Sequence, residues 1–347
     1  MEKNAEDIRK IQLTGKSTYI VSLPKRWVTE MKLKAGDGLT IQRLKDSSLL
    51  ILPKPPQKLE KVGEVDVKFL PNEDPYKIAR KIVSLYLLGY NVIRLTVDDG
   101  RISPTQREII KRFVRTKLVG TEITTDLPNE MTLQILLSYP ELSVKDAFRR
   151  MCLIARSMQK DAMTALEKLD RGLAKDVVQR DDEVDRFSTY VIRQLKSAVE
   201  NQRLIKEIGL STARDCLGYR LMTKSVERIA DHAALVAKNV LQLERPVKPT
   251  LFRKIIAMNT FAAAMFEKAI ESLFKEDYES AEKVIEREKA IRSLENRAVR
   301  YMLKKASRED VITLRLITES LRRMAEHSSD IAEIVLNLTA MGTIKQS

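Results

Sequence analysis

The sequence predicts a multidomain fold with a small β-rich head, a small α/β middle domain and a mainly α-helical tail of two tandem three-helix bundles. Short apolar runs typical of strands fill the first part of the chain, and strand-like and helix-like runs alternate in the next part. Long amphipathic patterns then occur twice at a fixed offset, which indicates a duplicated unit. The expected domains are 1–56, 57–140, 141–245 and 246–347.

The composition favours an anionic partner. Lys and Arg number 62 against 48 Asp and Glu, a formal net charge of +14, which suits nucleic acid, an acidic membrane surface or phosphate without choosing among them. The two cysteines are isolated, so neither a disulfide framework nor a zinc site is indicated. No apolar run approaches the roughly 18 residues that span a bilayer, and the charged start has no signal-peptide core. We therefore expect a cytoplasmic protein without membrane insertion.

The head, residues 1–56, has the local signals of a small β structure. A Thr-Gly-Lys turn separates two β-rich runs, Pro24 opens a short helix from Lys25 to Leu33, and a second hairpin is expected around Lys45 to Ser48. About fifty residues with one short helix bury too little apolar surface for a stable core. We expect the head to pair with a second copy of itself.

This head resembles the AbrB/SpoVT/MazE family of swapped-hairpin DNA-binding domains. The resemblance rests on Arg-Lys in the first strand, Gly-Lys at the turn, a strand ending in Pro-x-Arg, the short helix, and a Gly-Asp turn before the closing hairpin. It implies a swapped-hairpin β-barrel shared by a homodimer, with Trp27 anchoring the helix and basic residues facing DNA. Without the resemblance, the same charges fit a solubilising surface equally well. The DNA-facing residues that it implies are Arg9, Lys10, Lys16, Lys25 and Arg26.

The middle domain follows a stiff spacer, PKPPQK, at positions 53–58. Strand-like and helix-like segments alternate from there to about Ser138, which predicts a small α/β domain. It contains no Gly-rich phosphate loop and no arrangement of a nucleophile with a base. Its basic segment, EIIKRFVRTKLVG, fits a solvated helix face as well as a ligand surface.

The tail contains two copies of one pattern, because LMTKSVERIADHAALVAKNVL can be laid over LITESLRRMAEHSSDIAEIVL with His232 and His327 95 positions apart. An upstream helix repeats at an offset of 107, and one more apolar helix precedes each pair, so each copy is a three-helix unit. The apolar positions of the last helix are spaced four and three apart, the stripe of a packed helix. These positions are Met222, Val226, Ile229, Ala233, Val236 and Val240, then Ile317, Leu321, Met324, Ser328, Ile331 and Val335.

Carboxylates spaced four apart are the candidate site of the tail. Asp181 and Asp185 share one helix face, and Glu227 and Asp231 share another, so each pair can approach one cation. Crowded oxygen ligands suit magnesium, manganese or iron. An ordinary solvated helix face explains the same residues, and both interpretations stay open. His232 is more typical of a half-buried packing residue than of a ligand.

The duplication, the helix order and the E/D-xxx-D motif in its ERIADH context resemble the PhoU family, which is linked to phosphate uptake and phosphate signalling. The resemblance covers about Ser143 to Met341 and implies that the motif carboxylates bind iron, zinc or another divalent metal. In the first copy the matching residues are Asp181, Asp185, Glu227 and Asp231. In the second copy Arg292 and Arg322 replace two carboxylates, which leaves a weaker second site of Glu288, Glu326 and Asp330. Archaeal-type regulators that join an AbrB-like head to a PhoU-like tail carry a comparable middle insert.

These features favour a DNA-binding transcriptional regulator of phosphate uptake and phosphate homeostasis, with a sensory or docking tail. The alternative is an adaptor that does not bind DNA but docks on a phosphate ABC transporter or a sensor kinase and inhibits phosphate uptake. An enzyme is not expected and no catalytic residues are assigned, because neither histidine has a nearby Ser or Cys in a nucleophile context. The carboxylates are also expected on an open face rather than in a cleft.

Overall fold

The structure is a computed structural model that describes residues 7–43, 47–54, 63–98, 100–136, 142–200, 202–305 and 308–343. The chain divides into two compact units, Met1–Lys61 and Val62–Ser347. Within the described residues, no helix has both the length and the apolar content needed to cross a membrane.

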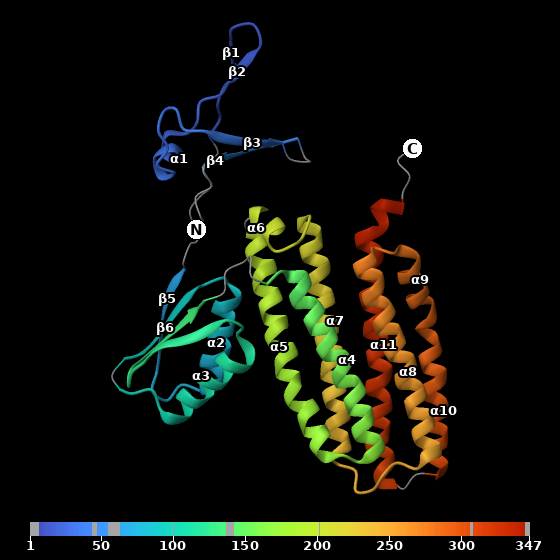
Figure 1. The fold of residues 1–347 in the computed structure, drawn as a ribbon. Coiled ribbons are helices and arrows are strands. Elements are labelled where there is room, and N and C mark those ends of the chain that lie inside the picture. Colours follow the sequence, from blue (N-terminus) through green and yellow to red (C-terminus); the bar gives the residue numbers. More distant parts are fainter. Residues whose placement is uncertain are drawn as a thin grey trace. The chain divides into compact units, whose positions relative to one another are not determined.

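The first unit contains two separate hairpins and one short helix (Figure 1). The helix was expected to reach Leu33 but ends at Glu30, because Lys32 takes a left-handed conformation with φ 51° that a helix cannot continue. The elements are β1 (Gln12–Thr14), β2 (Thr18–Ile20), α1 (Lys25–Glu30), β3 (Leu39–Arg43) and β4 (Leu49–Pro53), with β1 paired to β2 and β3 paired to β4, both antiparallel.

No residue in the described part of this first unit is buried. Even Trp27, the expected anchor of α1, is only half-buried. A single copy of the head therefore lacks a core of its own, and its apolar side chains face outward. The exposed large apolar residues are Ile8, Ile11, Leu13, Tyr19, Ile20, Val21, Ile41 and Leu49.

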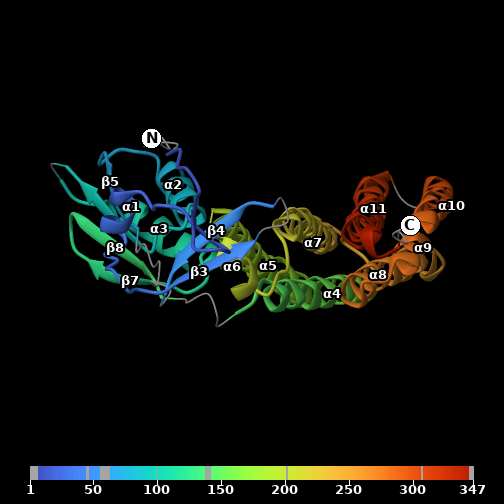
Figure 2. The same ribbon diagram turned by 90° about the horizontal axis from the view of Figure 1, so that it is seen from above.

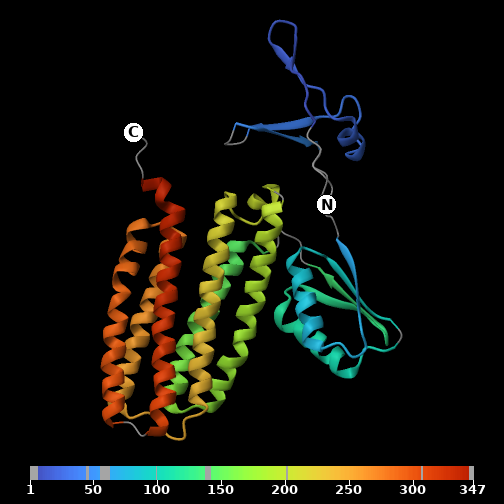
Figure 3. The same cartoon turned by 180° about the vertical axis from the view of Figure 1, so that it is seen from behind.

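The second unit begins with the predicted α/β domain. Its sheet has the strand order β5-β6-β8-β7, in which β5 and β6 are parallel and the other pairs antiparallel. Two helices cover one face of the sheet and lie between it and the helical tail (Figures 1 and 3). A separate core, which includes Ile82, Tyr86 and Leu95, fills the space between sheet and helices. The elements are β5 (Glu64–Phe69), α2 (Pro75–Leu87), β6 (Val92–Val97), α3 (Pro104–Lys117), β7 (Thr121–Asp126) and β8 (Glu130–Ile135).

The tail consists of two bundles that share one hydrophobic core. Bundle one is α4 (Val144–Lys168), α5 (Arg171–Glu200), the short α6 (Gln202–Glu207) and α7 (Ala213–Val240). Bundle two is α8 (Pro249–Lys275), α9 (Tyr278–Arg287), α10 (Lys289–Lys305) and α11 (Arg308–Thr343). The predicted three-helix unit is present in both, although in bundle two the middle helix is divided into α9 and α10.

The bundles join along equivalent helices, α7 beside α11 and α4 beside α8 (Figure 2). Every position of the two predicted apolar stripes is at most 1% exposed, so the four-three spacing located the packing faces of α7 and α11 correctly. Both α4 and α8 end at a left-handed residue, Leu169 (φ 52°) and Glu276 (φ 54°), which lie 107 positions apart and fix the register of the upstream helices of the two copies.

The two histidines meet where α7 and α11 pack. Their ring centroids are 5.8 Å apart with 25° between the planes, and His327 Nδ1 lies 2.9 Å from Asp330 Oδ2. Burial, followed by the neighbouring His327, lowers the pKa of His232 to about 4, so His232 is neutral at neutral pH. His232 is half-buried and packs against its counterpart in the other copy.

Candidate functional site

The candidate metal-site carboxylates of bundle one lie on two helices that pack together, α5 and α7. Burial raises the pKa of Asp181 to about 7, and the negative charges of Asp231 and Asp185 contribute to the shift. Burial also raises the pKa of Asp231, assisted by Glu227 and Asp185. Because carboxylates from both helices disfavour one another's ionisation, they form one acidic face rather than two independent pairs.

A lysine from the α/β domain reaches this acidic face. Lys117, the last residue of α3, places its Nζ 3.3 Å from Asp182 Oδ1 and donates a hydrogen bond to Asp185 Oδ2. Burial alone would lower the pKa of Lys117, but the hydrogen bond to Asp185 and the charges of both aspartates raise it above its ordinary value. Lys117 is therefore an ammonium ion, and it supplies a positive charge to the acidic face.

Glu227 is satisfied locally. Its carboxylate accepts hydrogen bonds from Lys224 Nζ at 2.6 Å and from Ser188 Oγ at 3.3 Å. Across the described residues, no three carboxylate, histidine or cysteine side chains converge on a position that could hold a metal ion. Of the four predicted ligands, Asp185 is held by Lys117 and Glu227 by Lys224, so as arranged the acidic face pairs two of its carboxylates with ammonium groups of the protein.

In bundle two the charge is reversed at the position equivalent to Glu227, and a carboxylate replaces an uncharged residue at the position equivalent to Ser188. Arg322 stands where bundle one has Glu227, and Glu295, only 7% exposed, stands where it has Ser188. Arg322 Nε lies 3.1 Å from Glu295 Oε2, and the Arg322 guanidinium also donates to Glu326. Arg315 donates to Glu295 as well. This bundle therefore neutralises its own carboxylates with arginines from α11.

The structure does not bring the three residues of the weaker second site to one point. Glu326 is held by Arg322, with Arg292 Nη2 more distant at 3.9 Å, and Asp330 accepts from His327. Glu288 lies at the break between α9 and α10.

A buried arginine that sequence reasoning missed fixes the α/β domain to bundle one. Arg193 of α5 is 4% exposed, and its guanidinium lies 4.8 Å from the centre of the Tyr86 ring. It donates to the Tyr86 carbonyl, to the carbonyls of Tyr90 (2.9 Å) and Gly89 (3.1 Å), and to Asn91 Oδ1 (2.5 Å). These acceptors lie in the last turn of α2 and directly after it, where Gly89 takes a φ of 92°. The sequence contains no clear signal for this contact, because the neighbours of Arg193 one turn away on α5 include the polar residues Thr189, Lys196 and Ser197.

The five predicted DNA-facing residues are all exposed in the described part of the head. Arg9 Nη2 lies 2.5 Å from Asp7 Oδ2, and Arg26 Nε lies 2.7 Å from Glu30 Oε1. Lys16 lies in the β1–β2 turn, and Lys25 begins α1 beside Arg26.

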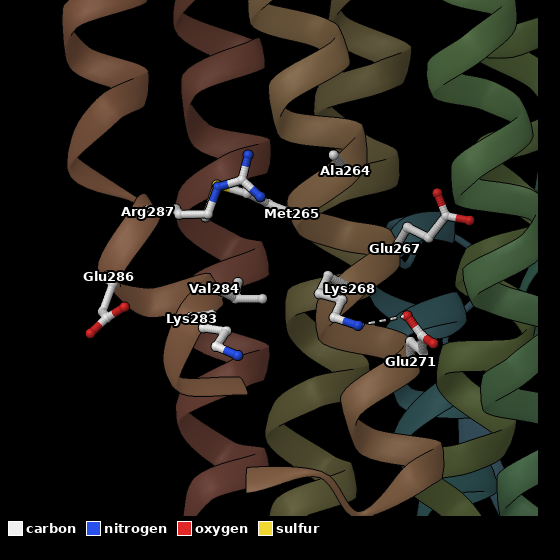
Figure 4. Close-up of a pocket in the computed structure, with 9 residues that line it drawn as sticks. All are labelled: Ala264, Met265, Glu267, Lys268, Glu271, Lys283, Val284, Glu286 and Arg287. Carbon is white, nitrogen blue, oxygen red and sulfur yellow. Dashed lines mark hydrogen bonds and ion pairs between the residues drawn. The ribbon is translucent and has the colours of Figure 1, made fainter. Parts of the chain in front are cut away.

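A groove of about 500 Å³ lies between α8 and α9 (Figure 4). It is lined by three basic and three acidic residues, and several are paired, such as Lys268 Nζ with Glu271 Oε2 at 3.1 Å and Glu267 with Arg156 at 2.9 Å. The six charged lining residues therefore carry no net formal charge.

The fold and these contacts define a class of protein: a duplicated three-helix-bundle protein with an α/β domain docked on its first bundle and a β-hairpin head. Residues 148–240 and 255–335, half of the chain, match the family model described as PhoU domain. The chain belongs to the PhoU domain family. Residues 12–59 match the model described as antidote-toxin recognition MazE, bacterial antitoxin. Both resemblances inferred from the sequence are therefore confirmed.

Relatives and solved structures agree with this assignment. The chain is 23% identical over 199 residues to the phosphate-specific transport system accessory protein PhoU homolog of Clostridium acetobutylicum, covering 54% of this chain and 87% of the relative. It is 25% identical over 186 residues to the homolog of Borreliella burgdorferi, covering 50% and 82%. The crystal structure of PhoU from Pseudomonas aeruginosa superposes with a TM-score of 0.52 at 22% identity, covering 57% of this chain and 96% of that one, which supports the bundle fold.

Proposed function

We propose that this protein is a DNA-binding transcriptional regulator of phosphate uptake and phosphate homeostasis. The observation that carries the proposal is the combination, in one chain, of a MazE-like head with a duplicated PhoU tail. The curated relatives of the tail are named as accessory proteins of a phosphate-specific transport system. In this proposal the head binds DNA and the tail senses phosphate status or docks on a partner protein.

The head acts as a homodimer in this proposal. Its two hairpins do not pair with one another, and the described part of the head buries no residue. Exposed apolar side chains on both hairpins supply the surface that a second copy would cover, as in a swapped-hairpin barrel. The dimer would bring both copies of Lys25 and Arg26 to one DNA duplex.

The test is a salt series with the full-length protein and genomic DNA fragments. If about six to ten phosphates are neutralised, affinity should fall by roughly 10³ to 10⁵ between about 50 and 200 mM salt. Replacing Lys25 and Arg26 with glutamine should flatten the slope by about one unit for each phosphate that is no longer neutralised. The matched control is Lys160→Gln/Lys175→Gln, which removes the same charge from exposed positions of the tail.

If the control variant lost DNA binding while the head variant retained it, the tail would be responsible and the regulator proposal would fail. The second candidate would then take its place: an adaptor that docks on a phosphate transporter or sensor kinase and inhibits uptake. The names of the relatives favour that candidate, because each is described as an accessory of a transport system.

We propose that the acidic face of bundle one binds iron, zinc or another divalent metal only weakly while Lys117 contacts Asp182 and Asp185. The support is the contact of Lys117 with Asp182 and Asp185 and the absence of a converging ligand set in the described residues.

A further inference from the structure

Bundle two contains a basic cavity between α8 and α10. Its volume is about 400 Å³. Three of its six lining residues are basic and none is acidic, in contrast to the groove between α8 and α9. The lining residues are Thr250, Arg253, Lys254, Ala257, Leu294 and Arg297.

The positive charges of this cavity are not neutralised by the protein. Among the described residues, Arg253 and Arg297 are exposed and form no ion pair with a carboxylate. Lys254 Nζ lies 5.4 Å from the centre of the Tyr301 ring, a contact that orients the ammonium without cancelling its charge. The first turn of α8 also borders the cavity, and the partial positive charge of a helix N-terminus adds to the field.

The other copy of the repeat shows that this cavity is not required by the fold. In the register fixed by Leu169 and Glu276, Arg253 corresponds to Asp146 and Arg297 corresponds to Tyr190. In bundle one, Asp146 accepts a hydrogen bond from the Ser143 hydroxyl at 2.7 Å, within the cap of α4.

Tyr190, the counterpart of Arg297, closes the equivalent place in bundle one. It is 1% exposed, and its hydroxyl donates to the Leu142 carbonyl at 2.7 Å, so an aromatic ring is buried at this position of bundle one. At the equivalent place bundle one is closed and carries one acidic and one basic residue, Asp146 and Arg150, whereas the cavity of bundle two is open and carries three basic residues and no acidic one. Packing alone explains the first arrangement and not the second.

We propose that this cavity of bundle two binds a phosphoryl dianion, either inorganic phosphate or a small phosphomonoester. Two guanidinium groups and one ammonium match the charge and the oxygen geometry of such a group better than those of a monovalent carboxylate. The volume lies in the range of small-molecule sites and leaves room for an organic substituent. The ligand would bind to bundle two alone, independently of any DNA binding by the head.

The test is isothermal titration of the full-length protein with inorganic phosphate and, separately, with glycerol 3-phosphate. Sodium chloride keeps the ionic strength constant, and sodium acetate serves as the monovalent comparison. We expect saturable binding of at least one phosphoryl ligand and none of acetate. Binding of both ligands, or of either one alone, supports the site. The pattern also shows whether the cavity takes inorganic phosphate, a phosphomonoester or both.

Two variants locate the binding. Arg253→Gln/Arg297→Gln should weaken it at least tenfold, and Arg297→Tyr, which introduces the residue found in bundle one, should remove it. The matched control is Arg214→Gln/Arg220→Gln, which removes two exposed arginines from α7 of bundle one and should leave the affinity within twofold.

Melting curves of all variants establish that they remain folded. No saturable binding by the parent protein would overturn the proposal, and so would an equal loss in the control variant. Because the head is intact in every variant, DNA binding measured on the same samples separates failure of this proposal from failure of the regulator proposal.

Discussion

Replacing Arg193 with methionine should separate the α/β domain from bundle one without unfolding either core. Methionine keeps the apolar stem but removes the donors that reach the Tyr90 and Gly89 carbonyls and Asn91 Oδ1. A hydrogen bond to a charged group contributes about 1.5–3 kcal/mol, and such contributions are not additive within one network. Leaving a buried neutral acceptor without its donor costs about 1–3 kcal/mol, and over several acceptors of one network we expect the free energy of unfolding to fall by about 3–5 kcal/mol in total.

The assay is urea denaturation followed by circular dichroism, together with hydrogen exchange of the amides in α2 and α3. The parent should unfold in one transition, whereas the variant should show an earlier transition in which α2 and α3 lose protection before α5 and α7. The stability of the Arg193→Lys protein should lie between that of the parent and that of Arg193→Met, because one ammonium cannot replace all the donors of the planar guanidinium. Lys196→Met, which removes an exposed charge one turn further along α5, is the matched control.

A loss smaller than about 1 kcal/mol in the Arg193→Met protein, with a single transition, would refute this reasoning. It would mean that apolar contacts of α2 and α3 with α5 hold the domain, and that the arginine only fills space.

Three further predictions concern the head, the acidic face of bundle one and the buried Glu295 of bundle two. Removing residues 1–56 should convert the protein from a dimer to a monomer in light scattering, and a truncated protein that stayed dimeric would place the interface in the tail. Lys117→Ala should raise the zinc or manganese bound per chain in elemental analysis, and adding Asp231→Ala should lower it again; unchanged content in both would reduce the acidic face to surface charge. Arg322→Met should destabilise the protein by about 1.5–3 kcal/mol, because the buried Glu295 keeps only Arg315 as a partner, and Arg322→Met/Glu295→Met should recover most of that loss in urea denaturation.

The sequence could reveal which residues of α7 and α11 face the core, because helical periodicity is a local property. Positions such as Ile229 and Ile331 repeat at the spacing of a packed helix, and no knowledge of the partner helix is needed to place them inside. The two copies could be recognised for the same reason, since a fixed offset between Met222 and Ile317 is visible without a structure.

The contacts that complete the candidate site could not be predicted in that way. Lys117 is 68 positions from Asp185, and Arg193 is 107 positions from Tyr86. A charged residue near a helix end carries no information about which distant element it meets, so Lys117 could be interpreted only as part of a basic helix face. The structure places Asp181, Asp185 and Asp231 close enough to shift one another's pKa, but their role as metal ligands stays a prediction, because the charge that neutralises them depends on the docking of another domain.

The two bundles neutralise their partly buried carboxylates in different ways. In bundle two, Arg322 belongs to the bundle itself, so the charge that neutralises Glu295 is present whenever the bundle is folded. In bundle one, the acidic face draws positive charge from Lys117 on a separate domain. A cation that displaced Lys117 from the acidic face would therefore weaken the docking of the α/β domain, and docking would weaken the binding of that cation by the same factor.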